Sequence, residues 1–362
     1  MGDSLNTVLD LSELNQRLGQ LFITGMPGTG LDEGTELLIR DYNLGGIILF
    51  SRNINDPMQL ARLCHDIQNA AARYQSDPLF IAIDQEGGRV ARLRKPFTVF
   101  PGNEAIGMDE RPVRKAVEFG TVTAREMKMI GLNMDLAPVV DVRKGRPERH
   151  LRGRLFSENP ETVALLGSKV VKALQGNGIM AVAKHFPGLG RASTDPHLNL
   201  PVIDTDIREI NEVNIPPFKA AIDMGVSAVM TSHALYIALD PENPATLSPV
   251  IINGLLRERL GFHGLIITDD LEMGAIAKGC GVPEGALASF QAGADILLIC
   301  EGQKNFPESL ALIREKILCG ELSNERLSQS LQRIKKAKSR FIKPKQKIMF
   351  RKVERYFMSR AS

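Results

Sequence analysis

The amino-acid sequence predicts an α/β protein built as a single (β/α)8 barrel of the TIM type. Eight short apolar runs recur along the chain, and stretches with helical periodicity lie between them. No G-x-G-x-x-G loop follows the first run, which counts against the alternative, a doubly wound dinucleotide-binding sheet. The 362 residues, 43% hydrophobic and 24% charged, suit one large barrel and exclude disordered chains and small disulfide scaffolds.

The predicted strands are continuously apolar rather than alternating. This pattern is typical of parallel strands that are buried on both faces. The runs are 21–26, 45–50, 79–84, 134–141, 180–186, 228–233, 265–269 and 294–300.

The predicted helices begin after capping residues or prolines, which favour helix starts. They span 57–74, 111–130, 160–175, 215–224, 249–260 and 283–292. Residues 305–341 are expected to form two closing helices, one ending near Gly320 and one running through 327–338. Without a composition break, we expect one catalytic domain over 1–341 and a basic C-terminal extension over 342–362.

Charge is distributed unevenly along the chain. From residue 331 to the end there are twelve Lys or Arg residues and one acid, Glu354, within an overall net charge of +3. A basic tail could bind nucleic acid, an anionic membrane or an acidic partner. We expect a solvated extension whose partner is unknown, and no nucleic-acid binding, because no nucleic-acid motif precedes it.

Cysteine usage and the N-terminal segment favour a cytoplasmic protein. The four cysteines form no C-x-x-C pair, so neither a zinc site nor a redox motif is predicted. The first twenty residues lack the basic and apolar regions of a signal peptide. No apolar run reaches membrane-spanning length.

Polar residues stand at the ends of several predicted strands, where a barrel places its active site. The third run ends at Asp84, and Gly87-Gly88 then allows close backbone approach to a ligand. The fifth ends in Lys184-His185, and lysine is rarely buried without a partner. For the segment that begins at Asp84, the alternative interpretation is a tight turn with solvated charges.

Three further strand-end features could carry chemistry. Asp195 and His197 are two residues apart in a loop, which fits an acid/base dyad and, equally, an ordinary surface loop. The sixth run ends at His233, and the seventh places Asp269 at the mouth as a possible nucleophile or metal ligand.

Two chemistries compete at this level. A metal-dependent hydrolase could use His185, His233 and Asp269, but the H-x-H pair expected after its first strand is absent. Metal-free glycosyl transfer would use Asp269 as nucleophile and another group as acid/base. A Schiff base on Lys184 is a third, weaker alternative.

Four motifs in order resemble glycoside hydrolase family 3, specifically the single-domain bacterial β-N-acetylhexosaminidases of cell-wall recycling. The resemblance runs from about residue 16 to about residue 340. Its motifs are Ile83-Asp-Gln-Glu-Gly-Gly-Arg-Val90, Asn133-Met-Asp-Leu-Ala-Pro-Val-Val-Asp141, Lys184-His-Phe-Pro-Gly188 with Asp195-x-His197, and Thr268-Asp-Asp-Leu-x-Met273.

The resemblance implies a retaining exo-β-N-acetylhexosaminidase that releases terminal N-acetylglucosamine from peptidoglycan fragments, with no cofactor and no metal. Asp269 would be the nucleophile, and His197 the general acid/base with Asp195 as its partner. The residues implied to bind the sugar are Asp84, Arg92, Arg154, Lys184 and His185. The alternatives are another family activity, β-glucosidase or glycoside phosphorylase, and a non-catalytic muropeptide-binding barrel.

The chain departs from the family pattern in three places. Leu189 replaces a common histidine, Pro196 replaces a common serine, and 143–154 is unusually basic. The chain also has no tryptophan, so sugar recognition would depend on charged and polar groups.

Overall fold

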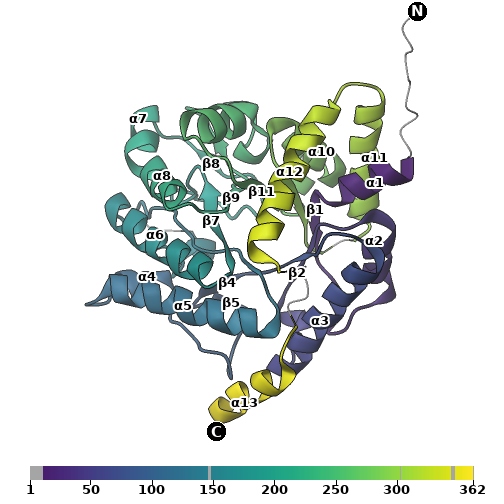
Figure 1. The fold of residues 1–362 in the computed structure, drawn as a ribbon. Helices are drawn as coiled ribbons and strands as arrows, with labels where there is room; N and C mark the ends of the chain where they lie inside the picture. The colour runs from purple at the N-terminus through teal and green to yellow at the C-terminus, as the bar shows by residue number, and fades with distance from the viewer. Residues whose placement is uncertain (1–10, 146–147, 302, 344–346, 362) are drawn as a thin grey trace, which may run out of the picture.

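At the centre of the fold, eight parallel strands close into a barrel in the order β1-β12-β11-β9-β7-β6-β3-β2 (Figure 1). The computed structural model describes residues 11–145, 148–301, 303–343 and 347–361. Parallel pairing of Ile23 with Leu298 joins the first strand to the last. The barrel strands are β1 (Phe22–Thr24), β2 (Gly46–Leu49), β3 (Phe80–Ile83), β6 (Met134–Asp135), β7 (Met180–Phe186), β9 (Ala228–Thr231), β11 (Leu265–Asp270) and β12 (Ile296–Ile299).

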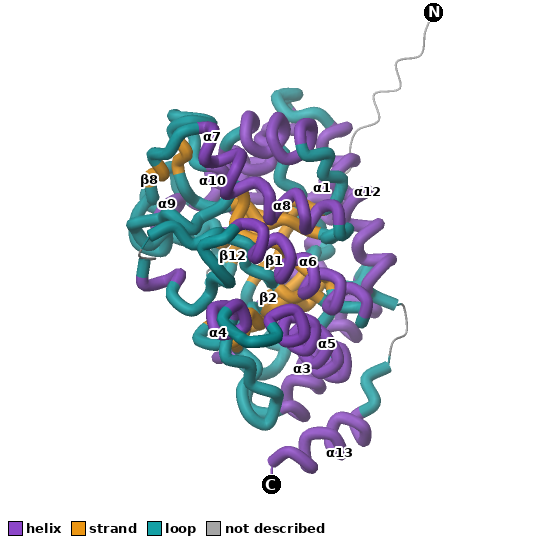
Figure 2. Tube along the Cα trace, turned by 90° about the vertical axis from the view of Figure 1, so that its left-hand side faces the viewer, coloured by secondary structure: helices purple, strands orange, loops and turns teal. Residues whose placement is uncertain are grey.

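The predicted fold class is confirmed, and each of the eight apolar runs overlaps one barrel strand; β11 extends one residue beyond its predicted run. In Figure 2 the barrel strands form the centre of the molecule and helices surround them. The outer helices are α1 (Leu11–Gly19), α2 (Glu33–Tyr42), α3 (Pro57–Tyr74), α5 (Pro112–Ile130), α6 (Pro160–Gly176), α8 (Ile215–Asp223), α10 (Val282–Ala292), α11 (Asn305–Leu318) and α12 (Asn324–Phe341).

Caps account for the well-predicted helix starts. The Asp56 carboxylate accepts hydrogen bonds from the backbone N–H groups of Met58 and Gln59, 2.8 and 2.9 Å away. The Asn159 side chain accepts from Thr162 N at 2.9 Å. Each satisfies N–H groups that the first helical turn leaves without a partner.

Several elements differ from the prediction. The segment predicted as a helix over 249–260 is π-helical over Val250–Arg259 (η5). Two small sheets pair β4 (Gln85–Gly87) with β5 (Val90–Ala91), and β8 (Val202–Ile203) with β10 (Leu235–Tyr236), outside the barrel. The helices α1 and α2 were not predicted.

The expectation of a solvated C-terminal extension is wrong for its described part. Residues Phe350–Ala361 form a helix, α13, that packs against α3 (Figure 1). Its Val353 and Phe357 side chains are buried, and the rings of Phe357 and Phe97 lie 4.5 Å apart. Arg360 also pairs with Glu126 of α5 at 2.7 Å. Apolar burial holds the helix despite its positive charge.

The structure bears on two further expectations, which concern membrane-spanning segments and the N-terminal segment. None of the described helices is both long and apolar enough to span a bilayer. Residues 1–10, half of the N-terminal segment without signal-peptide features, lie outside the described residues.

Candidate active site

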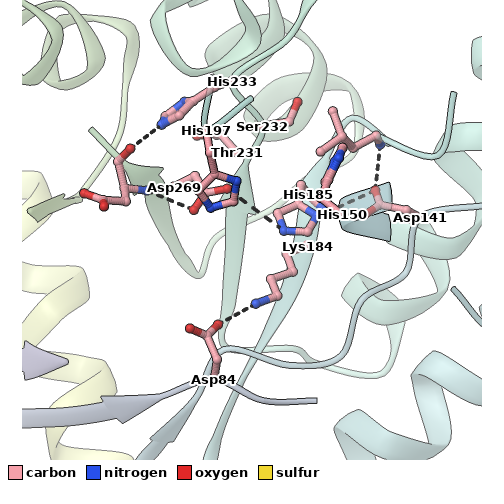
Figure 3. Close-up of polar contacts among 12 residues, drawn as sticks. Asp84, Asp141, His150, Lys184, His185, His197, Thr231, Ser232, His233 and Asp269 are labelled. Carbon is pink, nitrogen blue, oxygen red and sulfur yellow. Dashed lines mark hydrogen bonds and ion pairs between the residues drawn. The ribbon is translucent and has the colours of Figure 1, made fainter. Parts of the chain in front are cut away.

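Side chains from β7, β9 and β11, and from the segment after β3, meet at the carboxyl ends of the barrel strands (Figure 3). Every barrel strand points the same way, so residues at strand ends share one mouth. Asp84 follows β3, Lys184 and His185 lie in β7, His233 follows β9, and Asp269 lies in β11.

Four of the predicted sugar-binding residues form one ion-pair network. Lys184 Nζ lies 2.8 Å from Asp84 Oδ1 and 2.8 Å from Glu86 Oε1. The Arg154 guanidinium makes two 2.8 Å hydrogen bonds to the Glu86 carboxylate. Arg92 completes the network with a 3.1 Å hydrogen bond to Asp84.

Glu86 is a residue that sequence reasoning missed, although it stands inside a quoted motif. Its side chain is 1% exposed, and burial alone would raise its pKa. The charges of Arg154 and Lys184 outweigh burial and hold the Glu86 pKa well below its ordinary value. The ionised Glu86 carboxylate therefore fixes the two cations at the mouth.

His185 is oriented by a second missed residue, Asp141. Its Nδ1 lies 2.7 Å from Asp141 Oδ2, while Asp141 Oδ1 accepts from the backbone N–H groups of His185 and Leu189. A carboxylate at Nδ1 favours the tautomer with its proton there. His185 Nε2 then faces Asp269 Oδ2 at 4.0 Å.

Asp269 is held as an ionised carboxylate. Burial raises its pKa, but His185, His233 and Lys184 outweigh this and lower the pKa below the ordinary value. Its side chain keeps 19% of its surface exposed, so the carboxylate is reachable from the mouth. A carboxylate that is charged and accessible can act as a nucleophile.

His233 supports the strand that carries Asp269. Its Nε2 donates to the backbone carbonyl of Asp270 at 2.9 Å, and Nδ1 lies 2.8 Å from Thr246 Oγ1. Burial lowers the His233 pKa, although the Asp269 carboxylate opposes this. The sequence placed His233 at the end of the sixth apolar run, and any part that it has in the chemistry remains a prediction.

Asp195 and His197 form a hydrogen-bonded pair. His197 Nδ1 lies 2.7 Å from Asp195 Oδ1, which also accepts from the His197 backbone N–H at 3.0 Å. Burial raises the Asp195 pKa, but the hydrogen bonds from His197 outweigh it and leave the pKa lowered. The His197 ring is 63% exposed, so its Nε2 edge is open to a ligand.

The loop that carries this pair is attached to the segment after β11. The backbone N–H groups of Gly274 and Ala275 donate to the carbonyls of His197 and Pro196 at 3.1 and 3.0 Å. The segment that follows Asp269 thus fixes the dyad beside the barrel mouth, although the dyad is far from β11 in the sequence.

The structure brings the predicted residues together at the mouth in two groups, and their catalytic roles remain predictions. One group is the charged floor of Asp84, Arg92, Arg154, Lys184, His185 and Asp269, and the other is the Asp195–His197 loop. Among the described residues, no group of three or more His, Cys, Asp or Glu side chains is arranged to hold a metal ion.

The family model described as "Glycosyl hydrolase family 3 N terminal domain" matches residues 13–337. The chain belongs to glycosyl hydrolase family 3. The predicted resemblance is therefore confirmed, and α13 lies beyond the matched residues.

Curated relatives are identical to this chain at about a third of the aligned positions. "Beta-hexosaminidase A" of Pseudoalteromonas piscicida is 36% identical over 325 residues, which cover 84% of this chain and 54% of the relative. The chain thus spans about half the length of that protein. "Beta-hexosaminidase" of Thiobacillus denitrificans is 36% identical over 299 residues and covers 81% of both chains.

Two similar solved structures have the same fold. A β-N-acetylglucosaminidase from a Paenibacillus species superposes with a TM-score of 0.88 at 36% identity, covering 96% of this chain and 68% of its own. A β-N-acetylhexosaminidase from Beutenbergia cavernae gives 0.83 at 30% identity, covering 91% and 99%.

Proposed function

We propose that this family 3 protein is a retaining exo-β-N-acetylhexosaminidase that releases terminal β-linked N-acetylglucosamine from peptidoglycan fragments. The observation that carries the proposal is the ionised, accessible Asp269 at the barrel mouth, with the Asp195–His197 pair attached to the segment that follows it. The names of the relatives support the same activity.

In the first step an Asp269 oxygen forms a bond to the anomeric carbon while the bond to the leaving-group oxygen breaks. The protonated His197 gives its proton to that oxygen, so the aglycone departs as a neutral alcohol. Asp195 stabilises the imidazolium before the transfer and fixes the ring through Nδ1.

In the second step the neutral His197 takes a proton from water, and the water oxygen attacks the anomeric carbon. The bond to Asp269 breaks, the sugar leaves with retained configuration, and both residues return to their starting states. His185, which Asp141 orients, lies 4.0 Å from Asp269 and forms the wall of the site beside the carboxylate that departs.

The charged floor would bind the terminal sugar. Asp84 offers acceptor oxygens to sugar hydroxyls, while Lys184 and Arg154, fixed by Glu86, offer donors. Because Glu86 and Asp84 hold these side chains before the ligand arrives, little conformational entropy is lost on binding. We also expect the protein to work in the cytoplasm on soluble fragments.

The decisive measurement compares aryl β-N-acetylglucosaminide with aryl β-glucoside in the presence of EDTA. We expect EDTA-resistant release from the first and little from the second. Preference for the glucoside would assign a β-glucosidase, and a sugar phosphate formed only with added phosphate would assign a phosphorylase. No turnover of either substrate would favour a non-catalytic barrel that binds muropeptides.

Substitution of the proposed nucleophile tests the mechanism. Asp269→Ala should lower kcat by at least about 10³-fold, because the covalent step loses its nucleophile. Circular dichroism should show an unchanged fold, and azide should restore turnover of an activated aryl glycoside. Near wild-type activity without azide would refute the assignment of Asp269.

A further inference from the structure

His150 is a buried imidazole without a hydrogen-bond partner. It lies in a short 3-10 helix, η2 (Arg149–Leu151), in the basic loop between β6 and α6. The residue is 6% exposed, and in the described part of the chain neither ring nitrogen is hydrogen-bonded. Buried polar groups are normally hydrogen-bonded, so an imidazole left this way calls for a functional explanation.

The His150 ring lies close to a carboxylate of the proposed dyad. His150 Nδ1 lies 4.0 Å from Asp195 Oδ1, the same oxygen that accepts both hydrogen bonds from His197. Asp195 thus lies between two histidines, one exposed at the mouth and one buried.

Burial is the main reason that the His150 ring is neutral. Burial lowers the pKa; Asp195 opposes this, but Arg154, His185 and His197 add to it, and the pKa falls to about 4. At neutral pH the ring carries one N–H donor and no charge. A neutral donor can bind Asp195 without cancelling the negative charge that His197 needs.

The backbone of η2 is attached to the charged floor. Arg154 donates to the His150 carbonyl at 3.2 Å, and Arg154 is itself fixed by Glu86. Arg89 donates to the neighbouring Arg149 carbonyl. His150 therefore stands on a firmly held segment, whereas the Asp195–His197 pair lies on an exposed loop.

We propose that His150 is a positioning residue for the acid/base dyad. When a glycoside fills the mouth, the His150 N–H donates to Asp195, which requires the loop to move by about 1 Å to reach hydrogen-bond distance. The bridge His150–Asp195–His197 then aims His197 at the leaving-group oxygen. This inference rests on the proposed glycosidase function.

Two substitutions at position 150 separate hydrogen bonding from packing. His150→Leu keeps similar volume without a donor, while His150→Asn keeps an N–H donor near the Nδ1 position. We expect His150→Leu to lower kcat about tenfold on an alkyl β-N-acetylglucosaminide, which needs protonation of its leaving group. On a dinitrophenyl glycoside, which needs none, kcat should change by less than about twofold.

The matched controls are His150→Asn, which should restore most of the alkyl-glycoside activity, and His263→Leu on the surface, which should leave both rates unchanged. In an Asp195→Ala background, His150→Leu should cause no further loss, because its partner is gone. Equal losses on both glycosides, or losses that multiply in the double variant, would show a purely structural role and overturn the proposal.

One readout does not require turnover. The ¹⁵N ring signals of His197, recorded with N-acetylglucosamine bound, should shift in His150→Leu and stay in place in His263→Leu. If the His197 ring signals do not shift in His150→Leu, the proposed hydrogen bond between His150 and Asp195 is refuted. If the wild-type protein cleaves neither glycoside, the proposed function fails, while this spectrum still tests whether His150 and the dyad are coupled.

Discussion

Gly274 is the residue on which the position of the dyad loop depends most directly. A Cβ atom there would lie 2.6 Å from the Leu198 carbonyl oxygen and 2.7 Å from that of His197. Backbone cannot tolerate such contacts, so any side chain would push the loop away from the segment after β11. The hydrogen bond from Gly274 N to His197 O would be lost with it.

We therefore expect Gly274→Ala to lower kcat on alkyl β-N-acetylglucosaminides by roughly tenfold or more, since small displacements of a catalytic group are costly. Gly279→Ala is the matched control, because its Cβ would make only ordinary contacts, 3.5 Å or more from its neighbours. Steady-state kinetics of both variants test this. Equal activities would show that the loop absorbs the displacement.

The exposed His197 gives a second prediction at this scale. His197→Ala should reduce turnover of poor leaving groups by about 10²-fold or more, and activated aryl glycosides far less, because only the former need a proton. The measurement is kcat/KM across aryl glycosides of graded leaving-group pKa. An unchanged slope would contradict the acid role.

Residues at strand ends were predictable and their partners were not. Lys184 and Asp84 stood out because charge directly after an apolar run is unusual. Glu86 and Asp141 were missed as site residues because their importance comes from pairing with side chains on other segments. His150 carried no signal at all, since a lone histidine in a basic loop resembles any solvated residue.

At the scale of elements, the barrel strands were the easiest to predict. Their apolar, β-branched runs have one physical explanation, burial on both faces. Helix α13 was not predicted because its basic composition indicated a solvated tail, although its apolar residues have helical spacing. Val353, Tyr356 and Phe357 are spaced three and four residues apart and line one helix face.

The packing of α13 predicts a stability loss on truncation. Ending the chain after residue 341 should lower the free energy of unfolding by a few kcal/mol, because two buried side chains each contribute about 1.5–3 kcal/mol. Phe357→Ala should reproduce much of the loss, and Met358→Ala, at a 67% exposed site, should not. Urea unfolding measures all three, and an unchanged midpoint in the truncated chain would contradict the packing.

At the scale of the whole molecule, buried charge lies at both ends of the barrel. The mouth holds Lys184 with its two carboxylates, and at the opposite end Asp295 pairs with Arg257 and Arg333. The sequence predicted the first cluster through its motifs. It did not indicate the second, because the arginines come from segments far from Asp295 in the chain.

Asp270 makes the stability of the whole fold depend on pH. Burial, with the nearby charges of Glu272 and Asp269, raises its pKa to about 7. Between about pH 4 and pH 7 the unfolded chain releases this proton and the folded chain keeps it. The folded state then binds more protons, so this residue's contribution to stability falls as pH rises through that window.

Asp270→Asn should remove this loss. The Tm of the variant minus the Tm of the wild type should therefore be larger at pH 8 than at pH 4. The increase should be about 2–4 °C for each kcal/mol of stability recovered. Calorimetry at the two pH values provides the comparison. A Tm difference independent of pH would show that Asp270 is ionised in the folded protein.

The pairing of β1 with β12 also has a consequence for how the protein is made. The two strands lie at opposite ends of the barrel sequence, so β1 emerges from the ribosome long before its neighbour exists. At about 5–20 residues per second, translation leaves that edge of the sheet unpaired for tens of seconds. Until β12 is made, this edge exposes backbone donors and acceptors with which another chain can pair.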